Sequence, residues 1–418
     1  MTNKLFERKF RTNYKIPIFT ITLVFVIITS TISISFFKIF HIESTKIPQI
    51  YFYRWRSIPF YKKTVTFMSY VSNSHDIDHI YFQKIRAKAR GGGTANYAKH
   101  NFTIELPKKH QLAGLQKEDD WILDASFLEK SFMRSKISFD LFKSFNSSHK
   151  APECKYLEVY KNFQYRGLYI LLERMDKKRL EINKNDNTAC IFKEPPVFVD
   201  PKIEINSNPY EENDFYHQKF PDKLIKNKSK EIQNIREFIA YSSDSIFNNK
   251  ITSYFDLDDI IDWHILLLFT HNSDGIKKGF YLYKKDKNSP FKLALWDYDC
   301  SFGRDSDNEP HKAEIMDLNQ NTLIRRLLSL NTRKYKFRLK KRFKLLREKE
   351  ILCEKSILKM INENYLTLKP FISSNEKIWP VFSKEFYDNA NFEDEIKSIK
   401  RWIPVQLKEM DKYFNELK

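Results

Sequence analysis

Glycine is scarce in this chain: only 8 of its 418 residues are glycine. Three of them are consecutive: Gly91, Gly92 and Gly93. A run of this kind has two interpretations, a flexible hairpin turn or a loop whose backbone amides approach a phosphate closely. Three basic residues flank the run, Arg86, Arg90 and Lys99. They make the phosphate loop as strong an interpretation as the turn.

Cysteine is also rare, and its placement excludes the common zinc patterns. The four cysteines are far apart, with no CxxC pair: Cys154, Cys190, Cys300 and Cys353. Such cysteines are compatible with disulfides in an oxidising compartment, whereas buried free thiols are the default state. None of the ten histidines stands in an HExxH or similar spacing, so we expect no catalytic zinc site. Internal repeats and low-complexity tracts are absent from the sequence as well.

Only one long uncharged apolar run is present, at residues 16–37. Its length suffices for a helix that spans a hydrocarbon core of roughly 30 Å. A small-residue cleavage site does not follow it, so we predict a retained membrane anchor and not a signal peptide. Basic residues are slightly enriched before the run, which predicts a cytoplasmic tail at 1–15 and a large extracytoplasmic domain. Residues 38–60 are expected to form a stalk before a domain at 61–418.

Negative charge is in deficit, since the formal net charge is +19. The excess is spread along the chain, apart from a densely basic segment at 333–349. Basic residues with interleaved aromatics can bind nucleic acid. Apolar residues nevertheless recur there at helical spacing: Phe337, Leu339, Phe343, Leu346 and Ile351. We therefore expect an amphipathic helix with a solvated basic face, and do not expect nucleic acid as a partner.

Carboxylates gather at one end of a predicted β-hairpin. Asp274 precedes the first strand, GFYLYKK, and the second strand, FKLALW, leads into Asp297 and Asp299. In an antiparallel hairpin the start of the first strand lies beside the end of the second, so the three acids should meet. If the second strand continues, Asp297 and Asp299 share one face, opposite Trp296 and Tyr298. Aspartates at strand ends are often only turn caps, but an apolar run leading into same-facing acids favours a bound divalent cation, as in phosphoryl transfer.

The remaining pattern changes from strands to helices along the chain. We predict strands at 64–71, 80–90 and 101–106, an amphipathic helix within 120–145, and a hairpin that turns near Asn162 and ends at Glu173. Helices are predicted at 229–247 and 256–270 and over most of the remainder. A β-rich first half and a helical second half suggest two lobes with a boundary near 195–225.

Five segments, in order, resemble the CotH kinases, a family named for a bacterial spore-coat protein. They are KIRAKARGGGTANYAKHNFTIEL, DWILDASFLEKSFMRSKISFDLF, LEVYKNFQYRGLYILLERMDKKRL, YFDLDDIIDWHILLLFTHNSDG and ALWDYDCSFG. The resemblance runs from about residue 48 to the end of the chain. It implies an α+β, two-lobed atypical protein-kinase-like fold, with a β-rich N-lobe at about 61–200 and a mainly helical C-lobe at about 201–418. This fold would follow the N-terminal transmembrane helix.

The resemblance also implies roles for individual residues. Asp274 corresponds to the catalytic acid that accepts the proton of the attacking hydroxyl, and Asp297, with Asp299, to the metal ligands. The nucleotide-binding residues implied are Lys99, Arg90, Gly91, Gly92 and Gly93, with Glu173 near the hinge between the lobes. The family usually has an Asn as second metal ligand just before the first hairpin strand, where this chain has Lys278-Gly279. Asp299 and Asn272 are the candidates to replace it.

The function implied is that of a membrane-anchored protein kinase. It would use ATP with Mg²⁺ or Mn²⁺ and transfer the γ-phosphate to Ser or Thr of a surface or envelope protein. Lys278-Gly279 leaves open an alternative, a catalytically inactive CotH-like scaffold or adhesin. A basic polyanion-binding protein that uses residues 333–349 is the third possibility.

Overall fold

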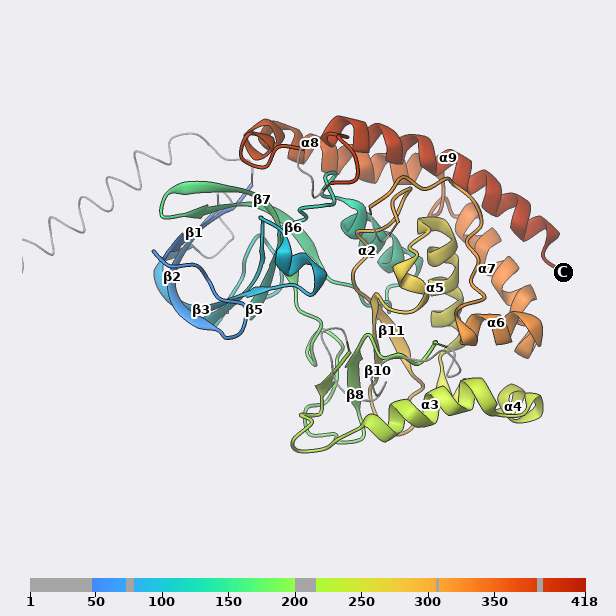
Figure 1. Ribbon diagram of the computed structural model, residues 1–418. Coiled ribbons are helices and arrows are strands. Elements are labelled where there is room, and N and C mark those ends of the chain that lie inside the picture. The colour runs from blue at the N-terminus through green and yellow to red at the C-terminus, as the bar shows by residue number, and fades with distance from the viewer. Residues whose placement is uncertain (1–46, 73–78, 200–215, 306–307, 382–385) are drawn as a thin grey trace, which may run out of the picture. The chain divides into compact units, whose positions relative to one another are not determined.

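Seven β-strands from the first part of the chain close into a barrel (Figure 1). The computed structural model describes residues 47–72, 79–199, 216–305, 308–381 and 386–418, and the chain from Ile47 to Lys418 forms one compact unit. The barrel strands are β1 (Gln49–Tyr53), β2 (Thr64–Val71), β3 (Ile80–Arg90), β4 (Asn101–His110), β5 (Glu118–Asp124), β6 (Cys154–Lys161) and β7 (Gln164–Glu173). Their order around the barrel is β1-β2-β3-β4-β5-β7-β6.

The barrel closes through a parallel pair. β1 is antiparallel to β2 but parallel to β6, with Gln49 opposite Glu158. The Gln49 side-chain amide donates a 2.9 Å hydrogen bond to the Glu158 carboxylate across this seam. All other barrel neighbours are antiparallel. The seam therefore leaves neither β1 nor β6 as a free edge.

The barrel interior is a packed apolar core. Ala87 in β3 lies opposite Ile104 in β4, which lies opposite Trp121 in β5, and all three side chains are fully buried. A small residue beside large ones lets the inward side chains of neighbouring strands fill a narrow barrel. The alternation of inward and outward residues follows from the period of two along each strand.

A second, antiparallel sheet follows the barrel in the chain. Its strands are β8 (Cys190–Lys193), β9 (His217–Phe220), β10 (Phe280–Lys284) and β11 (Lys292–Leu295), in the order β11-β10-β8-β9. The helices are α2 (Arg134–Phe145), α3 (Ser229–Tyr241), α4 (Asp244–Tyr254), α5 (Leu257–Thr270), α6 (Thr322–Ser329), α7 (Tyr335–Glu348), α8 (Glu354–Ile378) and α9 (Phe392–Glu416). Short 3₁₀ turns are η1 (Gly93–Asn96), η2 (Asp274–Ile276) and η3 (Thr332–Lys334).

Helix α5 is the centre of the helical part. Nearly all of its residues are buried, including Trp263 and His264. It contacts α2, α7, α9 and β11. Its start is fixed by Asp256, whose side chain accepts hydrogen bonds from the backbone amides of Asp258 and Asp259. A helix that is buried on nearly all sides is stable only when other elements surround it, which accounts for the bundle around α5.

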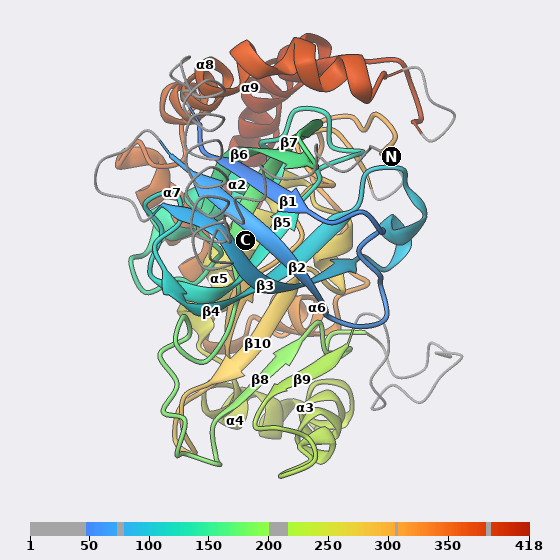
Figure 2. The same cartoon turned by 90° about the vertical axis from the view of Figure 1, so that its left-hand side faces the viewer.

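The long helices α8 and α9 pack on each other, and α8 also reaches the barrel (Figures 1 and 2). Contact with β7 is closest at Gly167, where a Cβ atom would lie 2.6 Å from Oδ1 of Asn375 in α8. Asn375 Oδ1 accepts a 3.0 Å hydrogen bond from the backbone amide of Leu168. Trp379 Nε1, just after α8, donates to the Arg166 carbonyl at 3.0 Å. The barrel and the helices are thus joined by specific polar contacts.

The predicted fold class is wrong. The first strands form a closed seven-stranded barrel with a separate four-stranded sheet, and not the β-rich lobe of a two-lobed kinase fold behind a transmembrane helix. Pattern analysis finds strands, but pairing of β1 with β6 across more than a hundred residues leaves no local signal. Part of the predicted stalk also belongs to the barrel, since β1 occupies Gln49–Tyr53.

The predicted membrane localisation is corrected too. The run at 16–37 and the tail at 1–15 lie outside the described residues. Among the helices of the described ranges, none combines the length and the apolar character that a membrane crossing requires. The assignment of a single-pass protein with an extracytoplasmic domain is therefore withdrawn.

Candidate functional site

The ends of four strands converge on one cavity of about 330 Å³. Arg90 ends β3, Asp124 ends β5, Lys193 ends β8, and Trp296 directly follows β11. The acidic residues that line the cavity are Asp124, Glu129, Glu194, Asp274, Asp297 and Asp299. The basic ones are Arg90, Lys99, Lys193 and Lys278. A cavity lined by both signs of charge suits a ligand that carries anionic groups and a bound cation.

The structure brings together all of the residues named from the sequence except Glu173 and Asn272. Those that line the cavity are Asp274, Asp297, Asp299, Lys99, Arg90, Gly91, Gly92 and Gly93. Glu173 does not line it. Its carboxylate pairs with Arg179 at 3.0 Å and accepts from the backbone amide of Gln116 at 3.3 Å. Glu173 therefore braces the end of β7 from within the protein.

The hairpin prediction is confirmed, and it explains why the acids meet. β10 and β11 are antiparallel with Phe280 opposite Leu295, so Asp274 and Asp297 lie at the same end. The predicted strand continuation to Asp299 is wrong, because β11 ends at Leu295 and Asp297 has a φ of 57°. The direction of the Asp297 side chain is therefore set by this left-handed turn, and not by the alternation of side chains along a strand.

Gly279 makes the turn at the start of β10 possible. Its φ is 79°, and its carbonyl accepts a 3.0 Å hydrogen bond from the Trp296 amide. A Cβ atom at this position would lie 3.1 Å from the Trp296 carbonyl oxygen. Glycine is thus required for close passage of the two hairpin ends.

The acids at the cavity carry unfavourable charge in the absence of a cation. Loss of hydration within the cavity, followed by the neighbouring Glu194, raises the pKa of Asp297 to about 6, although Lys193 opposes the shift. Loss of hydration and the neighbouring Asp297 also raise the pKa of Asp299 well above its usual value. Asp297 is nevertheless exposed and Asp299 partly exposed, so both can serve as oxygen ligands of a hard divalent ion, which would stabilise their charged forms.

Asp274 lies at the start of η2 and is only partly buried. Its carboxylate forms a 2.9 Å ion pair with Lys278. Asn272, one of the two candidates for a second metal ligand, does not line the cavity. Its amide nitrogen donates to the Asp297 carbonyl at 3.3 Å, and its oxygen accepts from the Gly275 amide at 3.2 Å. Asn272 thus orients the chain around Asp297, whereas Asp299 lies at the cavity.

The glycine run lies in a hairpin connection and also lines the cavity. β3 and β4 form a hairpin in which Arg90 pairs with Asn101, so the run belongs to its connection. The run also lines the cavity. Gly91 has a φ of 146°, and a Cβ atom there would lie 2.5 Å from Oγ1 of Thr94. The Arg90 guanidinium group stacks 5.4 Å from the centre of the Trp296 ring, which holds its charge at the cavity.

Lys99 is held in a way that its sequence position does not indicate. Its ammonium group donates to the backbone carbonyls of Ala125, at 2.7 Å, and Leu168, and lies 3.5 Å from Asn375 Oδ1. Burial lowers its pKa to about 7. These contacts direct the charge of Lys99 towards backbone oxygens inside the protein.

Four charged cavity residues escaped the sequence analysis: Asp124, Glu129, Lys193 and Glu194. Lys193 Nζ lies 2.8 Å from the Glu194 carboxylate, and Glu194 also accepts from the Gly279 amide at 3.3 Å. Asp124 follows the apolar stretch WIL as Asp297 follows LALW, a signal that was available. Lys193 and Glu194 directly precede Pro195 and Pro196, at the predicted boundary between the two lobes.

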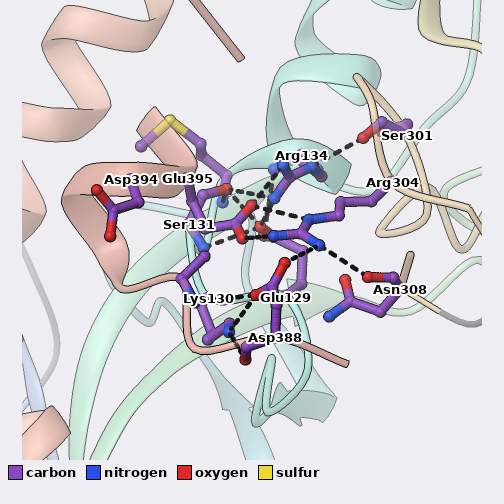
Figure 3. Close-up of polar contacts among 12 residues, drawn as sticks. Glu129, Lys130, Ser131, Arg134, Ser301, Arg304, Asn308, Asp388, Asp394 and Glu395 are labelled. Atoms are coloured by element: carbon purple, nitrogen blue, oxygen red, sulfur yellow. Dashed lines mark hydrogen bonds and ion pairs between the residues drawn. The ribbon is translucent and has the colours of Figure 1, made fainter. Parts of the chain in front are cut away.

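A buried ion-pair network holds the segment that follows the acids (Figure 3). Arg134 in α2 bonds the Glu129 and Glu395 carboxylates, each at 2.7 Å, and the Ser301 carbonyl at 2.8 Å. Arg304 also pairs with Glu395, and with Asp388 at 2.7 Å. The network therefore ties the chain after Asp299 to α2 and α9.

Comparison with known proteins gives two findings. The family described as CotH kinase protein matches residues 87–410. The chain is also 25% identical, over 255 residues, to Inner spore coat protein H of Bacillus subtilis (strain 168). That alignment covers 57% of this chain and 65% of the relative, a little less than two thirds of its length.

Proposed function

Because the chain belongs to the CotH kinase family, we propose that it transfers the γ-phosphate of ATP to a Ser or Thr hydroxyl of a protein. The observation that carries the proposal is the pair of acids, Asp297 and Asp299, that lines a cavity together with basic side chains and has raised pKa values. Phosphoryl transfer depends mainly on positioning and on charge stabilisation, and this cavity offers the groups for both.

Asp297 and Asp299 are the residues that would hold Mg²⁺ or Mn²⁺. When bound, such an ion neutralises the charge of the phosphates and of the transferring group. Both ligands would be carboxylate oxygens, which a hard divalent ion prefers. The raised pKa of each aspartate indicates that the neighbouring basic side chains do not offset the negative charge of the pair. Asn272 supports this pair by holding the Asp297 backbone.

Arg90 and Lys193 are the cations that we assign to the phosphates. Both lie at strand ends on the cavity and within 6 Å of the Trp296 ring, at 5.4 and 5.9 Å. The backbone amides of the Gly91 to Gly93 run lie beside them. Lys99, which the family resemblance assigns to the phosphates, is proposed to act structurally because backbone carbonyls already surround its ammonium group.

Asp274 is the residue that would align the attacking hydroxyl and accept its proton. It lines the cavity and keeps about a quarter of its side chain exposed, so an acceptor side chain can approach it from solvent. Lys278 would stabilise the carboxylate form through its 2.9 Å ion pair. The acceptor that we propose is a structural coat-type protein, on the strength of the relative's name, Inner spore coat protein H.

The test is a transfer assay with the full chain, γ-labelled ATP, and Mg²⁺ or Mn²⁺. We expect label on the chain itself or on a generic Ser/Thr acceptor. Asp297→Asn and Asp274→Asn should each reduce transfer by at least about 100-fold while leaving the protein folded. Asp258→Asn is the matched control, since this acid begins α5 but its side chain is 83% exposed and lies outside the cavity.

One observation favours a second candidate, a scaffold without turnover. Lys278 stands where the family usually has a metal-binding Asn, and it is already paired with Asp274. Folded wild-type protein that neither transfers label nor binds ATP with a divalent ion would favour the scaffold. Undiminished transfer by Asp297→Asn would contradict the assignment of that residue.

A further inference from the structure

Two histidines and a glutamate meet outside the cavity, on segments far apart in the chain. Nε2 of His271 lies 3.1 Å from Nε2 of His311, and the latter lies 3.4 Å from Oε1 of Glu314. One ligand atom from each residue falls within 4.8 Å of the others. None of the three residues lines the cavity that contains Asp297.

The two imidazole rings present the same kind of nitrogen to one point. Their centroids are 4.1 Å apart, with an interplanar angle of 37°. A direct hydrogen bond between two Nε2 atoms requires one ring to donate and the other to accept. A metal ion between them needs lone pairs from both rings, and ligand nitrogens in zinc sites lie about 2.0–2.1 Å from the metal. Two nitrogens about 3 Å apart can reach that geometry with small side-chain movements.

The backbone holds these ligands in place. His271 caps the end of α5 in the left-handed conformation, with a φ of 51° and its amide bonded to the Leu267 carbonyl. The His311 amide donates to the Gly303 carbonyl at 2.9 Å. Buried Gln406 in α9 donates to the carbonyls of both Glu314, at 2.8 Å, and Leu268. The three segments are therefore fixed relative to one another before any ion binds.

The cluster is anchored inside the protein and open at its outer edge. His271 is only 7% exposed. Glu314 has 59% of its side chain exposed and His311 has 33%, so solvent reaches the cluster from one side.

We propose that His271, His311 and Glu314 bind a divalent transition-metal ion of the Zn²⁺ class. Two imidazoles and one carboxylate form a three-ligand set that zinc accepts, with a fourth position open to water. The bound ion cross-links the end of α5 to the segment around residues 303–314, which follows the acids of the cavity in the chain. The site is thus a clamp on the fold near the cavity and not a part of the cavity itself.

The test is a titration of the full chain, freed of metal with a chelator, with Zn²⁺ by calorimetry and with Co²⁺ by visible absorption. We expect one Zn²⁺ per chain at this site, and Co²⁺ bands typical of mixed nitrogen and oxygen ligands. Loss of an outer-shell partner alone costs about 10–100-fold in metal affinity. His271→Gln and His311→Gln should therefore lower Zn²⁺ affinity by at least about 100-fold, and Glu314→Gln by about 10-fold.

Two controls keep the outcome decisive. His79→Gln changes an exposed histidine elsewhere and should bind as the wild type does, and Asp297→Asn should also keep the site. Circular dichroism shows whether each variant is folded, and His311 and Glu314 are exposed enough to be replaced without a buried defect. Binding that survives both histidine variants, binding lost only in Asp297→Asn, or no stoichiometric binding at all would each overturn the proposal and leave a hydrogen-bonded histidine pair.

Discussion

Two lysines illustrate how the same charge can act differently at one cavity. Lys99 is buried with its ammonium group among backbone carbonyls, whereas Lys193 pairs with Glu194 and faces Trp296. Sequence similarity identifies a lysine beside the glycine run but says nothing of where its Nζ points. The residue-level assignment of phosphate contacts therefore had to come from the geometry.

Replacing these lysines separates the two roles. We expect Lys193→Ala to raise the KM for ATP by about 10-fold, because one charge-assisted contact is lost, with little change in Tm. Lys99→Met should instead lower the free energy of unfolding by about 1–3 kcal/mol, since the Ala125 and Leu168 carbonyls lose their donor. Urea unfolding and steady-state kinetics measure both. A raised KM for ATP in folded Lys99→Met would instead indicate that Lys99 contacts the phosphates.

Asp297 should also give stability a characteristic pH dependence in the absence of divalent ions. Its pKa rises from 3.8 when unfolded to about 6 when folded, so the folded protein keeps this proton longer. Stability should therefore fall as pH rises from about 4 to about 6, by less than the full pKa shift would give, because solvent around the exposed Asp297 screens its charge. Urea midpoints at pH 4.5 and 7.5, with chelator present, measure this. Asp297→Asn should lose this part of the pH dependence. Equal slopes of stability against pH in the wild type and the variant would contradict a raised pKa at Asp297.

At the scale of elements, Arg134 shows how one side chain couples three of them. It joins α2 to Glu395 in α9 and to Ser301 after the acids. Arg134→Met leaves the buried Glu129 and Glu395 without this partner, and we expect a loss of about 3–5 kcal/mol in unfolding free energy. Arg338→Met, which removes a pair to exposed Asp258, is the control and should cost about 0–1 kcal/mol.

The coupling can be checked with a double variant. Arg134→Met combined with Glu395→Gln should cost less than the sum of the two single changes, because the second change removes a charge that the first left unpaired. Additive losses would show that Arg134 acts only through packing. A transfer assay on the same variants reports whether the segment after Asp299 must be held for activity.

Several elements were predictable because their signals are local. β2 and β3 have the predicted bounds, 64–71 and 80–90. Each run of strand-forming residues ends where polar residues begin, so the ends of these strands are visible in the sequence. The predicted helix at 229–247 is divided at Ser243, whose side chain caps α4 by accepting from the Ile246 amide. In α7 the stripe of Leu339, Phe343 and Leu346 is buried, but Phe337 is 62% exposed because it falls off that face.

The basic face of α7 has internal partners, which bears on binding of polyanions. Arg342 pairs with Asp262 and Arg347 with Asp411, and Arg338 pairs with Asp258. Charges already paired contribute less to attraction of nucleic acid. Three arginines of α7 are therefore engaged by acids of other elements, which the spacing alone did not predict.

At the scale of the whole molecule, the site was easier to predict than the architecture. The acids meet at one end of a hairpin of about twenty residues, and this hairpin can be recognised directly in the sequence. Barrel closure and the cluster of His271 with His311 depend on contacts between distant segments. Spacing rules for metal ligands examine neighbours in sequence, so His271, forty positions before His311, escaped them.

The barrel and the helices should unfold as one unit because α8 is bonded to β7. Asn375→Leu removes the acceptor for the Leu168 amide, and we expect a loss of about 1–3 kcal/mol and a broader thermal transition. Asn362→Leu, at an exposed position of α8, is the matched control. Calorimetry that still gives one sharp transition for Asn375→Leu would show that other contacts maintain the coupling.

During synthesis β1 is made long before β6, the strand with which it forms the parallel seam. Gln49 leaves the ribosome more than a hundred residues before its partner Glu158, so a nascent chain carries β1 with one side unpaired for that whole interval. An unpaired strand edge is a template for pairing with other chains. Chaperone contact should therefore concentrate on β1 and end when β6 emerges, which makes translation speed between residues 53 and 154 a determinant of yield.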